Sequence, residues 1–455
     1  MKLLMCWALL LAALPADAAP RFEAKLPGGI AMQVAEFPVS SGAAADASVG
    51  AISYLRPGKD RPVLFAFNGG PGASSAFLHM GLLGPERAAV PQDPKAVLPA
   101  KAPLVANAES LLDVADIVLL DPPGTGFSEL KPGTAPDFYR SVSGDADAVS
   151  QGALAWLAAH GRMGSPVYIL GESYGTIRAT AMVEALKKRD PALKLRGVLL
   201  LGQALNMIET SQRPGNVVTW PVNLPTLAAV SCWHRGCDPE KAAEAASAFG
   251  PAYLGGLYRG RELDATERAR LAGQLAALTG LPADGWEARG LKLSKEQYRL
   301  ELLHGEGRVL ARYDARYTGT DPKGDAFTPV SNLFGAALTE RFAKLGVPGD
   351  YKVLARTEGG WAYGGADSPF ADWPFMQVIE RAMAADPQFR LFIGTGLYDL
   401  TTTVGAADYL VAQTRADPAR IVNRRYKAGH MTYSDDVARQ TLSADIRAFL
   451  QAGAK

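Results

Sequence analysis

The stretch that decides the fold is Val167-Tyr168-Ile169-Leu170-Gly171-Glu172-Ser173-Tyr174-Gly175, which is followed by the helix-like segment Thr176–Lys188. Its first four residues form a short apolar run of the kind found in strands buried on both faces. Glycine on both sides of Glu172-Ser173-Tyr174 permits a sharp turn between strand and helix, and such a turn presents the central hydroxyl above a sheet. Ser173 is therefore a candidate nucleophile, with a serine in a purely structural turn as the alternative.

Similar apolar runs recur along the chain and are separated by helix-like segments such as Asp145–His160. Strands that alternate with helices are typical of an α/β fold with a mostly parallel central sheet. Alternation near the start, over Phe22–Val39 and Ala51–Leu55, predicts an opening antiparallel meander. The other runs predicted as strands are Val63–Phe67, Ile117–Leu120, Val198–Leu201, Leu391–Ile393 and Ile421–Val422.

The alternation stops over residues 206–340, which are rich in Ala, Glu, Lys and Arg. Because the α/β pattern resumes afterwards, we predict a mostly helical cap inserted into one catalytic domain, whose two parts are residues 19–205 and 341–455. The segments of the cap with helical periodicity are Glu240–Phe249, Glu262–Leu278 and Lys295–Leu303.

Residues 1–18 are typical of a secretory signal peptide. Lys2 supplies the positive start, Leu3–Leu14 is apolar, and Ala16-Asp17-Ala18 is a small-x-small cleavage site. The apolar run is shorter than the roughly 20 residues that a membrane-spanning helix needs. We expect an exported protein, periplasmic or secreted, without a membrane anchor.

Cleavage would leave two cysteines, Cys232 and Cys237. Cysteines this close together in an oxidising compartment are expected to form a disulfide. The alternative is a metal site, but His234 is the only further ligand nearby. We therefore expect a disulfide and no metal.

The overall composition indicates a globular protein and excludes several classes. Of the 455 residues, 48% are hydrophobic and 20% charged, which excludes a disordered chain. Lys and Arg total 47 against 46 Asp and Glu, for a formal charge of +1. Without a basic stripe, a nucleic-acid partner has no electrostatic basis.

A serine nucleophile needs a base, and the base needs an orienting acid. Of the five histidines, His430 is the one that follows a late strand, in Ala428-Gly429-His430-Met431. Asp399 stands just past the run Leu391–Ile393, and catalytic groups gather at the carboxyl ends of parallel strands. The order Ser173, Asp399, His430 is that of a hydrolase triad. A surface aspartate and a buried structural histidine are the alternatives.

Acyl transfer also needs hydrogen-bond donors for an oxyanion. The loop Asn68-Gly69-Gly70-Pro71-Gly72 follows the predicted strand Val63–Phe67, and the N–H groups of Gly70 and Tyr174 could point at one carbonyl oxygen. The alternative is a phosphate-binding loop, which would need a Gly-Lys-Ser/Thr sequence that is missing here.

Four motifs together resemble the serine carboxypeptidase family. The resemblance implies an α/β-hydrolase fold, a helical cap, and removal of C-terminal residues from peptides without a cofactor. It also implies that Ser173 is the nucleophile, Asp399 the acid and His430 the base. The motifs are Asn68-Gly69-Gly70-Pro71-Gly72-Ala73-Ser74-Ser75, Asp121-Pro122-Pro123-Gly124-Thr125-Gly126-Phe127-Ser128, Gly171-Glu172-Ser173-Tyr174-Gly175 and Gly429-His430-Met431.

The same resemblance implies the remaining site residues. Gly70 and Tyr174 would supply the oxyanion donors, while Asn68, Gly69 and Glu172 would bind the terminal carboxylate of the peptide. Two departures concern this carboxylate site: Leu82 falls where the family often has a glutamate, and Thr432-Tyr433 follows the base where Val-Pro is usual.

Two other functions remain open at this point. An esterase or acyltransferase could use the same scaffold, although Asn68 and Glu172 favour the peptidase. A catalytically silent binding protein could use the cleft and the cap, although the complete triad speaks against it.

Overall fold

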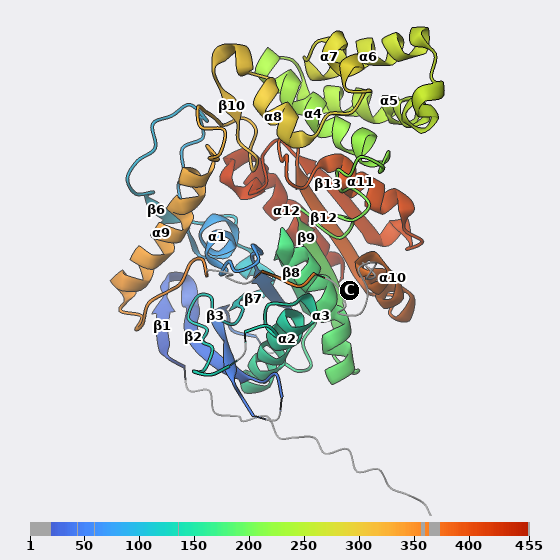
Figure 1. Cartoon of the computed structure of the whole chain (residues 1–455). Coiled ribbons are helices and arrows are strands. Elements are labelled where there is room, and N and C mark those ends of the chain that lie inside the picture. The colour runs from blue at the N-terminus through green and yellow to red at the C-terminus, as the bar shows by residue number, and fades with distance from the viewer. Residues whose placement is uncertain are drawn as a thin grey trace, which may run out of the picture.

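The computed structural model describes residues 20–42, 44–58, 60–134, 136–355, 360–363 and 374–453. The predicted signal peptide lies outside these residues. The main sheet has nine strands in the order β1-β2-β3-β7-β4-β8-β9-β12-β13 (Figure 1). These strands are β1 (Phe22–Leu26), β2 (Ile30–Val39), β3 (Ala47–Leu55), β4 (Val63–Phe67), β7 (Asp116–Asp121), β8 (Val167–Glu172), β9 (Leu195–Leu201), β12 (Arg390–Gly396) and β13 (Ile421–Tyr426).

The opening strands are antiparallel and the rest of the sheet is parallel. β3 pairs antiparallel with both β2 and β7, whereas every neighbouring pair from β7 to β13 is parallel. A mostly parallel sheet with an antiparallel opening confirms the predicted α/β-hydrolase fold. Two short hairpins lie outside this sheet: β5 (Glu86–Ala88) with β6 (Leu104–Ala106), and β10 (Val309–Leu310) with β11 (Thr318–Gly319).

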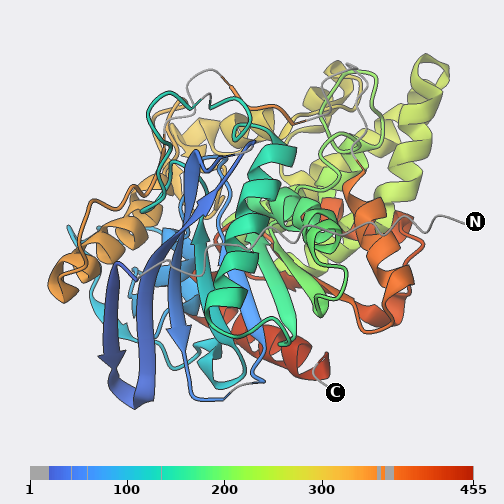
Figure 2. The same cartoon turned by 90° about the horizontal axis from the view of Figure 1, so that it is seen from below.

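Helices cover both faces of the sheet (Figure 1 and Figure 2). In β4, Leu64 packs into one apolar core and Phe65 into the other, because successive side chains of a strand point to opposite faces. The first core also takes side chains of α1 (Ala76–Leu78), α9 (Thr328–Leu345) and α12 (Asp436–Ala452). The second takes side chains of α2 (Val142–Ala159), α3 (Tyr174–Arg189), α10 (Phe375–Ala385) and α11 (Val404–Gln413). This burial on both faces explains why the strands read as continuous apolar runs.

Five helices form a separate layer above the carboxyl side of the sheet (Figure 1). They share their own apolar core, to which Leu397 and Leu400 of the loop after β12 also belong. The cap therefore rests on the loop that contains Asp399. The helices are α4 (Thr219–Arg235), α5 (Pro239–Arg259), α6 (Ala265–Thr279), α7 (Ala283–Ala288) and α8 (Lys295–Glu301).

A disulfide closes the turn between α4 and α5, where it joins Cys232 to Cys237. Gly236 ends α4 in the left-handed conformation, with φ 75°, so the chain reverses at once and the two cysteines meet.

The cap differs from the predicted insertion at its C-terminal end. The expected boundary at residue 340 falls inside α9, and α9 does not pack with the cap. Its Leu333, Phe334 and Leu338 are buried with Leu78 in the first of the two cores that flank the sheet. Figure 1 shows α9 beside α1. The sequence indicated that residues 206–340 are mostly helical, but that pattern carries no information about which core a helix joins.

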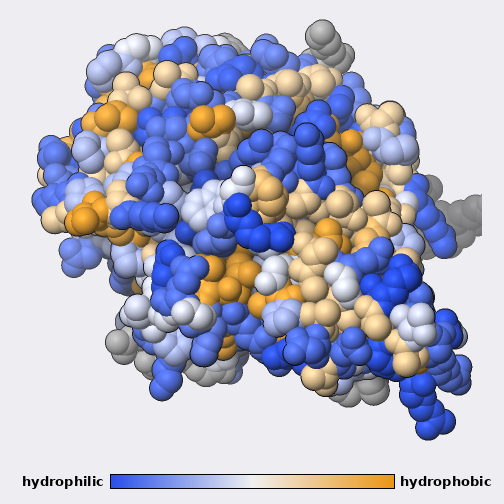
Figure 3. All heavy atoms as spheres, turned by 90° about the horizontal axis from the view of Figure 1, so that it is seen from above, coloured by the Kyte–Doolittle hydropathy of each residue, from blue (hydrophilic) through white to orange (hydrophobic). Residues whose placement is uncertain are grey.

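The face seen from above the cap is covered mostly by hydrophilic side chains, with apolar side chains gathered in separate patches (Figure 3). Among the residues that the structure describes, no helix has the length and apolar character needed to cross a membrane.

Candidate active site

Ser173 lies in the turn between β8 and α3. Its backbone has φ 59° and ψ −128°, a left-handed region that residues other than glycine rarely adopt. A Cβ on Gly171 would stand 2.0 Å from the Gly175 carbonyl oxygen, so the turn can close only with glycine there. This is the sharp strand-to-helix turn predicted from the sequence, and it exposes the serine at the carboxyl edge of the sheet.

His430 and Asp399 are brought together from the loops after β13 and β12. His430 Nδ1 lies 2.6 Å from Asp399 Oδ2, and both side chains are buried. The other carboxylate oxygen, Oδ1, accepts from the backbone N–H groups of Thr401 at 2.7 Å and Thr402 at 3.0 Å. With a carboxylate as acceptor, Nδ1 carries the imidazole proton and Nε2 is the basic nitrogen.

The imidazole lies beside the Ser173 turn. Ser173 N donates to the carbonyl of Leu201 at 2.9 Å, at the end of β9. The next residue, Gly202, faces the histidine ring: a Cβ there would lie 3.0 Å from His430 Cε1. One strand end therefore contacts both the candidate nucleophile and the candidate base.

The surroundings of His430 set its protonation. Burial alone would lower its pKa, but the charge and hydrogen bond of Asp399 outweigh burial, so the pKa of His430 is raised above its usual value. Glu172 acts in the same direction as Asp399, and Lys295 in the opposite one. A base with a raised pKa is strong, but it must be neutral to accept a proton.

The glycine-rich loop lies directly against the Ser173 turn. A Cβ on Gly69 would come within 2.6 Å of Tyr174 N and of the Glu172 carbonyl oxygen, so only glycine fits. Gly70 follows with φ 99° and is exposed. The loop and the N-terminus of α3 are thus next to each other, as an oxyanion site made from Gly70 and Tyr174 requires.

Glu172 is a buried carboxyl group with two hydrogen-bond donors. Its Oε2 accepts from Asn68 Nδ2 at 2.6 Å and from the Tyr433 hydroxyl at 2.8 Å. Burial raises the pKa of Glu172 to about 7, against the lowering effects of His430 and of both hydrogen bonds. Glu172 bonds with these side chains, so it does not serve as a simple cap of α3.

Tyr433 is a site residue that the sequence did not single out, although its position after the base was seen to be unusual. Its ring occupies space that Gly81 leaves open, since a Cβ on Gly81 would lie 2.1 Å from Tyr433 Cδ2. Leu82, beside that glycine, is fully buried in the apolar core. The Tyr433 hydroxyl thus bonds Glu172. Burial is the largest cause that raises the pKa of Tyr433 well above its usual value, so this hydroxyl remains a donor.

Thr402 and Lys295 also contact the acid loop. The Thr402 hydroxyl donates to Asp399 Oδ2 and lies 3.2 Å from His430 Nδ1. Lys295, at the start of α8 in the cap, donates through Nζ to the Thr401 carbonyl at 2.7 Å. The sequence alone does not indicate that Lys295 belongs to the site, because its contact joins the cap to a loop more than a hundred residues later.

Three other histidines have structural partners. His79 bonds the Tyr54 hydroxyl at 2.7 Å, His160 bonds the Trp156 carbonyl at 2.8 Å, and His234 bonds the Ala315 carbonyl at 2.9 Å. Within the described ranges, no cluster of His, Cys, Asp and Glu side chains has the arrangement of a metal site.

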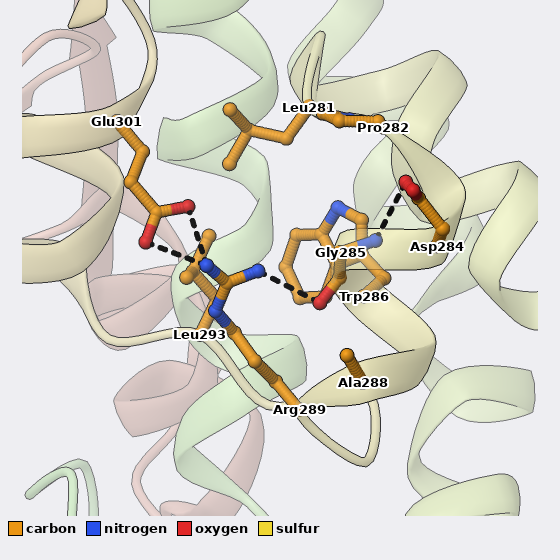
Figure 4. Close-up of a pocket in the computed structure, with 9 residues that line it drawn as sticks. All are labelled: Leu281, Pro282, Asp284, Gly285, Trp286, Ala288, Arg289, Leu293 and Glu301. Carbon is orange, nitrogen blue, oxygen red and sulfur yellow. Dashed lines mark hydrogen bonds and ion pairs between the residues drawn. The ribbon is translucent and has the colours of Figure 1, made fainter.

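A cavity of about 540 Å³ lies within the cap (Figure 4), and Ser173 is not among its described lining residues. Figure 4 shows the Arg289 guanidinium between Glu301 and the Gly285 carbonyl, and it donates to Glu301 Oε1 at 2.9 Å and to Gly285 at 2.7 Å. The arginine in this cavity is therefore already neutralised.

Comparison with protein families gives a match over residues 53–216, which contain the glycine-rich loop and the Ser173 turn. The family that matches is serine carboxypeptidase. The resemblance stated from the motifs is confirmed, and the chain is a serine hydrolase. The match ends before the cap, so Asp399 and His430 lie outside it. No curated protein gave a significant sequence match.

Solved structures similar to this chain include three enzymes or enzyme-related proteins. A proline iminopeptidase-related protein from Thermus thermophilus is 19% identical, with 92% of this chain and 98% of that chain covered and a TM-score of 0.35. A serine hydrolase from Cycloclasticus zankles is 12% identical, with coverage of 92% and 98% and a TM-score of 0.41. A thermophilic esterase from Thermogutta terrifontis is 13% identical, with coverage of 93% and 100% and a TM-score of 0.36.

Proposed function

We propose that this serine hydrolase is a carboxypeptidase that removes C-terminal residues from peptides. The observation that carries the proposal is the buried Glu172 carboxyl group, bonded by Asn68 and Tyr433 and placed next to Ser173 in the chain. A hydrolase acting on neutral esters gains nothing from a buried acid at this point. A substrate that ends in a carboxylate does gain, because protonated Glu172 and the Asn68 amide can both donate to it.

In this proposal Ser173 Oγ attacks the carbonyl of the last peptide bond while His430 Nε2 takes its proton. Asp399 holds the tautomer and stabilises the imidazolium, and the N–H groups of Gly70 and Tyr174 stabilise the oxyanion. His430 then protonates the departing amine, which leaves the acyl group on Ser173. A water molecule, deprotonated by His430, hydrolyses this acyl-enzyme and restores the serine.

Peptide cleavage should therefore depend on the terminal carboxylate and on the proton of Glu172. We expect an amidated peptide to be cleaved about 10- to 100-fold less efficiently than the free acid at pH 6, because charge-assisted hydrogen bonds are lost. The carboxyl with its raised pKa of about 7 is protonated below that pH and donates; above it, two carboxylates repel. KM for the free acid should thus rise with pH through 7.

The variant Glu172→Gln tests this directly, since it keeps a donor and removes the titration. It should flatten the pH dependence of peptide KM more than it lowers kcat. The matched control is Glu184→Gln, an exposed position on α3 that pairs with Arg381. Mass spectrometry of paired acid and amide peptides gives the rates. Equal cleavage of both forms, with pH profiles unaffected by Glu172→Gln, would contradict the carboxypeptidase proposal.

Lys295 should contribute to the lower pH limit of activity, alongside the larger effects of burial and of Asp399. Its ammonium disfavours the imidazolium form of His430, so Lys295→Met should raise the pKa of His430 and move the ascending limb of kcat/KM to higher pH. The readout is hydrolysis of a neutral ester across pH. Lys295→Arg, which keeps the charge, and Lys292→Met, whose ammonium bonds Pro214 instead, should leave the profile in place. An unchanged profile in Lys295→Met would exclude this electrostatic role.

We also propose that the protein is exported after removal of residues 1–18. The Cys232–Cys237 disulfide supports an oxidising compartment. Cell fractionation followed by N-terminal sequencing should find a chain that begins at Ala19 outside the cytoplasm. A cytoplasmic chain that begins at Met1 would contradict export.

A further inference from the structure

A cavity of about 340 Å³ adjoins the glycine-rich loop. Gly72 of that loop and Trp361 both line it. The Trp361 Nε1 donates to the Tyr174 hydroxyl at 3.0 Å. The cavity is therefore next to the side chain of the residue that follows Ser173.

The cavity contains a buried guanidinium that is not fully satisfied. Arg178, on α3, is completely buried and donates through Nε to Asp145 Oδ2 and through Nη1 to the Asn68 carbonyl, both at 2.7 Å. Its Nη2 has no hydrogen-bond acceptor among the described residues. A buried N–H group without an acceptor is costly, so a carbonyl or carboxylate oxygen that entered the cavity would be bound here.

Lys352 also lines the cavity, and Asp145 is the one carboxylate among the described lining residues. Asp145 Oδ2 is already occupied by Arg178 and by the Tyr174 hydroxyl at 3.0 Å. Lys352 is exposed, and its side chain adds positive charge to the cavity lining. The lining thus suits an anion better than a cation.

The walls of the cavity are largely apolar, with Pro123, Leu130, Tyr139 and Leu354 among them. Such walls suit methylene groups that lead to a charged end. A free inorganic anion would leave these walls without contacts, whereas a Glu or Asp side chain would bring its carboxylate toward Arg178 and its methylenes against the walls.

We propose that this cavity is a subsite for an acidic side chain, Glu or Asp, on the acyl residue that precedes the bond broken at Ser173. For a peptide substrate this rests on the proposed function, in which Asn68 and Glu172 take the other end of the substrate. The residue before the scissile bond is then the part of the substrate whose side chain can occupy the space beside Tyr174. The subsite would make the enzyme selective for peptides with an acidic penultimate residue.

The test uses activated esters, so that it does not depend on carboxypeptidase activity. The probes are the α-p-nitrophenyl esters of N-acetyl-glutamate and N-acetyl-glutamine, which have the same shape and differ in charge. The wild-type protein should hydrolyse the glutamate ester about tenfold more efficiently in kcat/KM, the ratio expected for a charge-assisted hydrogen bond. High salt should reduce this ratio, because the Lys352 charge is exposed to screening.

Two variants locate the effect in the cavity. Lys352→Glu reverses an exposed charge and should reduce the glutamate-to-glutamine ratio at least about fivefold. Arg178→Lys keeps the charge but loses the planar guanidinium, and should reduce the ratio further. The matched control, Lys25→Glu, makes the same charge change on the exposed side of β1 and should leave the ratio unchanged.

A ratio near one in the wild-type protein would overturn the proposal, as would a ratio that Lys352→Glu does not alter. Because Lys352 is on the surface, this second outcome remains measurable even if Arg178→Lys does not fold. If the ester ratio behaves as expected but no peptide is cleaved, the subsite stands and the carboxypeptidase proposal fails. If peptides are cleaved without any preference for the acidic residue, the carboxypeptidase proposal stands and the subsite proposal fails.

Discussion

Replacement of Ser173 by alanine is expected to lower kcat for peptides and for neutral esters about 10⁶-fold, since in the proposed mechanism Ser173 Oγ forms the acyl-enzyme. His430→Ala should cost a similar factor, because His430 is the proposed base for the serine proton. Members of a catalytic triad act as a unit, so the double variant should be scarcely worse than either single one. The measurement is the steady-state rate of the wild-type protein, both single variants and the double variant, with one peptide and one ester.

Neither substitution should unfold the protein, so a loss of rate would report on catalysis. The Ser173 backbone N–H bonds the Leu201 carbonyl, and alanine keeps that bond. Thermal unfolding of the variants should be close to that of the wild-type protein. A control is Ser150→Ala on α2, where a buried hydroxyl donates to Ala146 at 2.7 Å and activity should be retained. Full activity in Ser173→Ala, or fluorophosphonate labelling of another residue, would remove Ser173 as nucleophile.

Much of the fold could be predicted because strands buried on both faces have a short-range signature. The run predicted at Val167–Leu170 lies within β8, and that at Val63–Phe67 matches β4. Helix α9 shows the limit of such patterns. Its period is helical, but its partners, such as Leu78, are some 250 residues earlier in the chain. A local sequence pattern carries no information about contacts between segments so far apart in the chain.

The candidate site likewise contains residues that could be predicted from the sequence and residues that could not. Ser173, Asp399 and His430 could be picked out because each follows a predicted strand, and parallel strands end at one edge. Tyr433 could not be picked out, because its contact with Glu172 needs the space that Gly81 leaves on a different segment. Lys295 was also missed, since the docking of the cap brings it to the acid loop. Residues that complete a site through tertiary packing have no local signal.

Replacement of Asp399 by asparagine should lower kcat about 10⁴-fold, the effect of the wrong imidazole tautomer. The structure shows why the amide cannot avoid this. The backbone N–H groups of Thr401 and Thr402 both donate to Oδ1, so the amide oxygen must stay there. Its NH₂ group then takes the place of Oδ2, 2.6 Å from His430 Nδ1. Two donors cannot face each other, so the imidazole proton moves to Nε2.

A histidine protonated on Nε2 cannot take the Ser173 proton, and the loss should appear in kcat for peptides and esters alike. The matched control is Asp408→Asn, because Asp408 lies on α11 and bonds Asn423 and Arg425 instead of His430. Asp116, which pairs with Arg61 and Arg162, is the other carboxylate to compare. If Asp399→Asn cost less than tenfold while one of these two cost more, the orienting acid would be that residue, and the short contact of Asp399 with His430 would be structural.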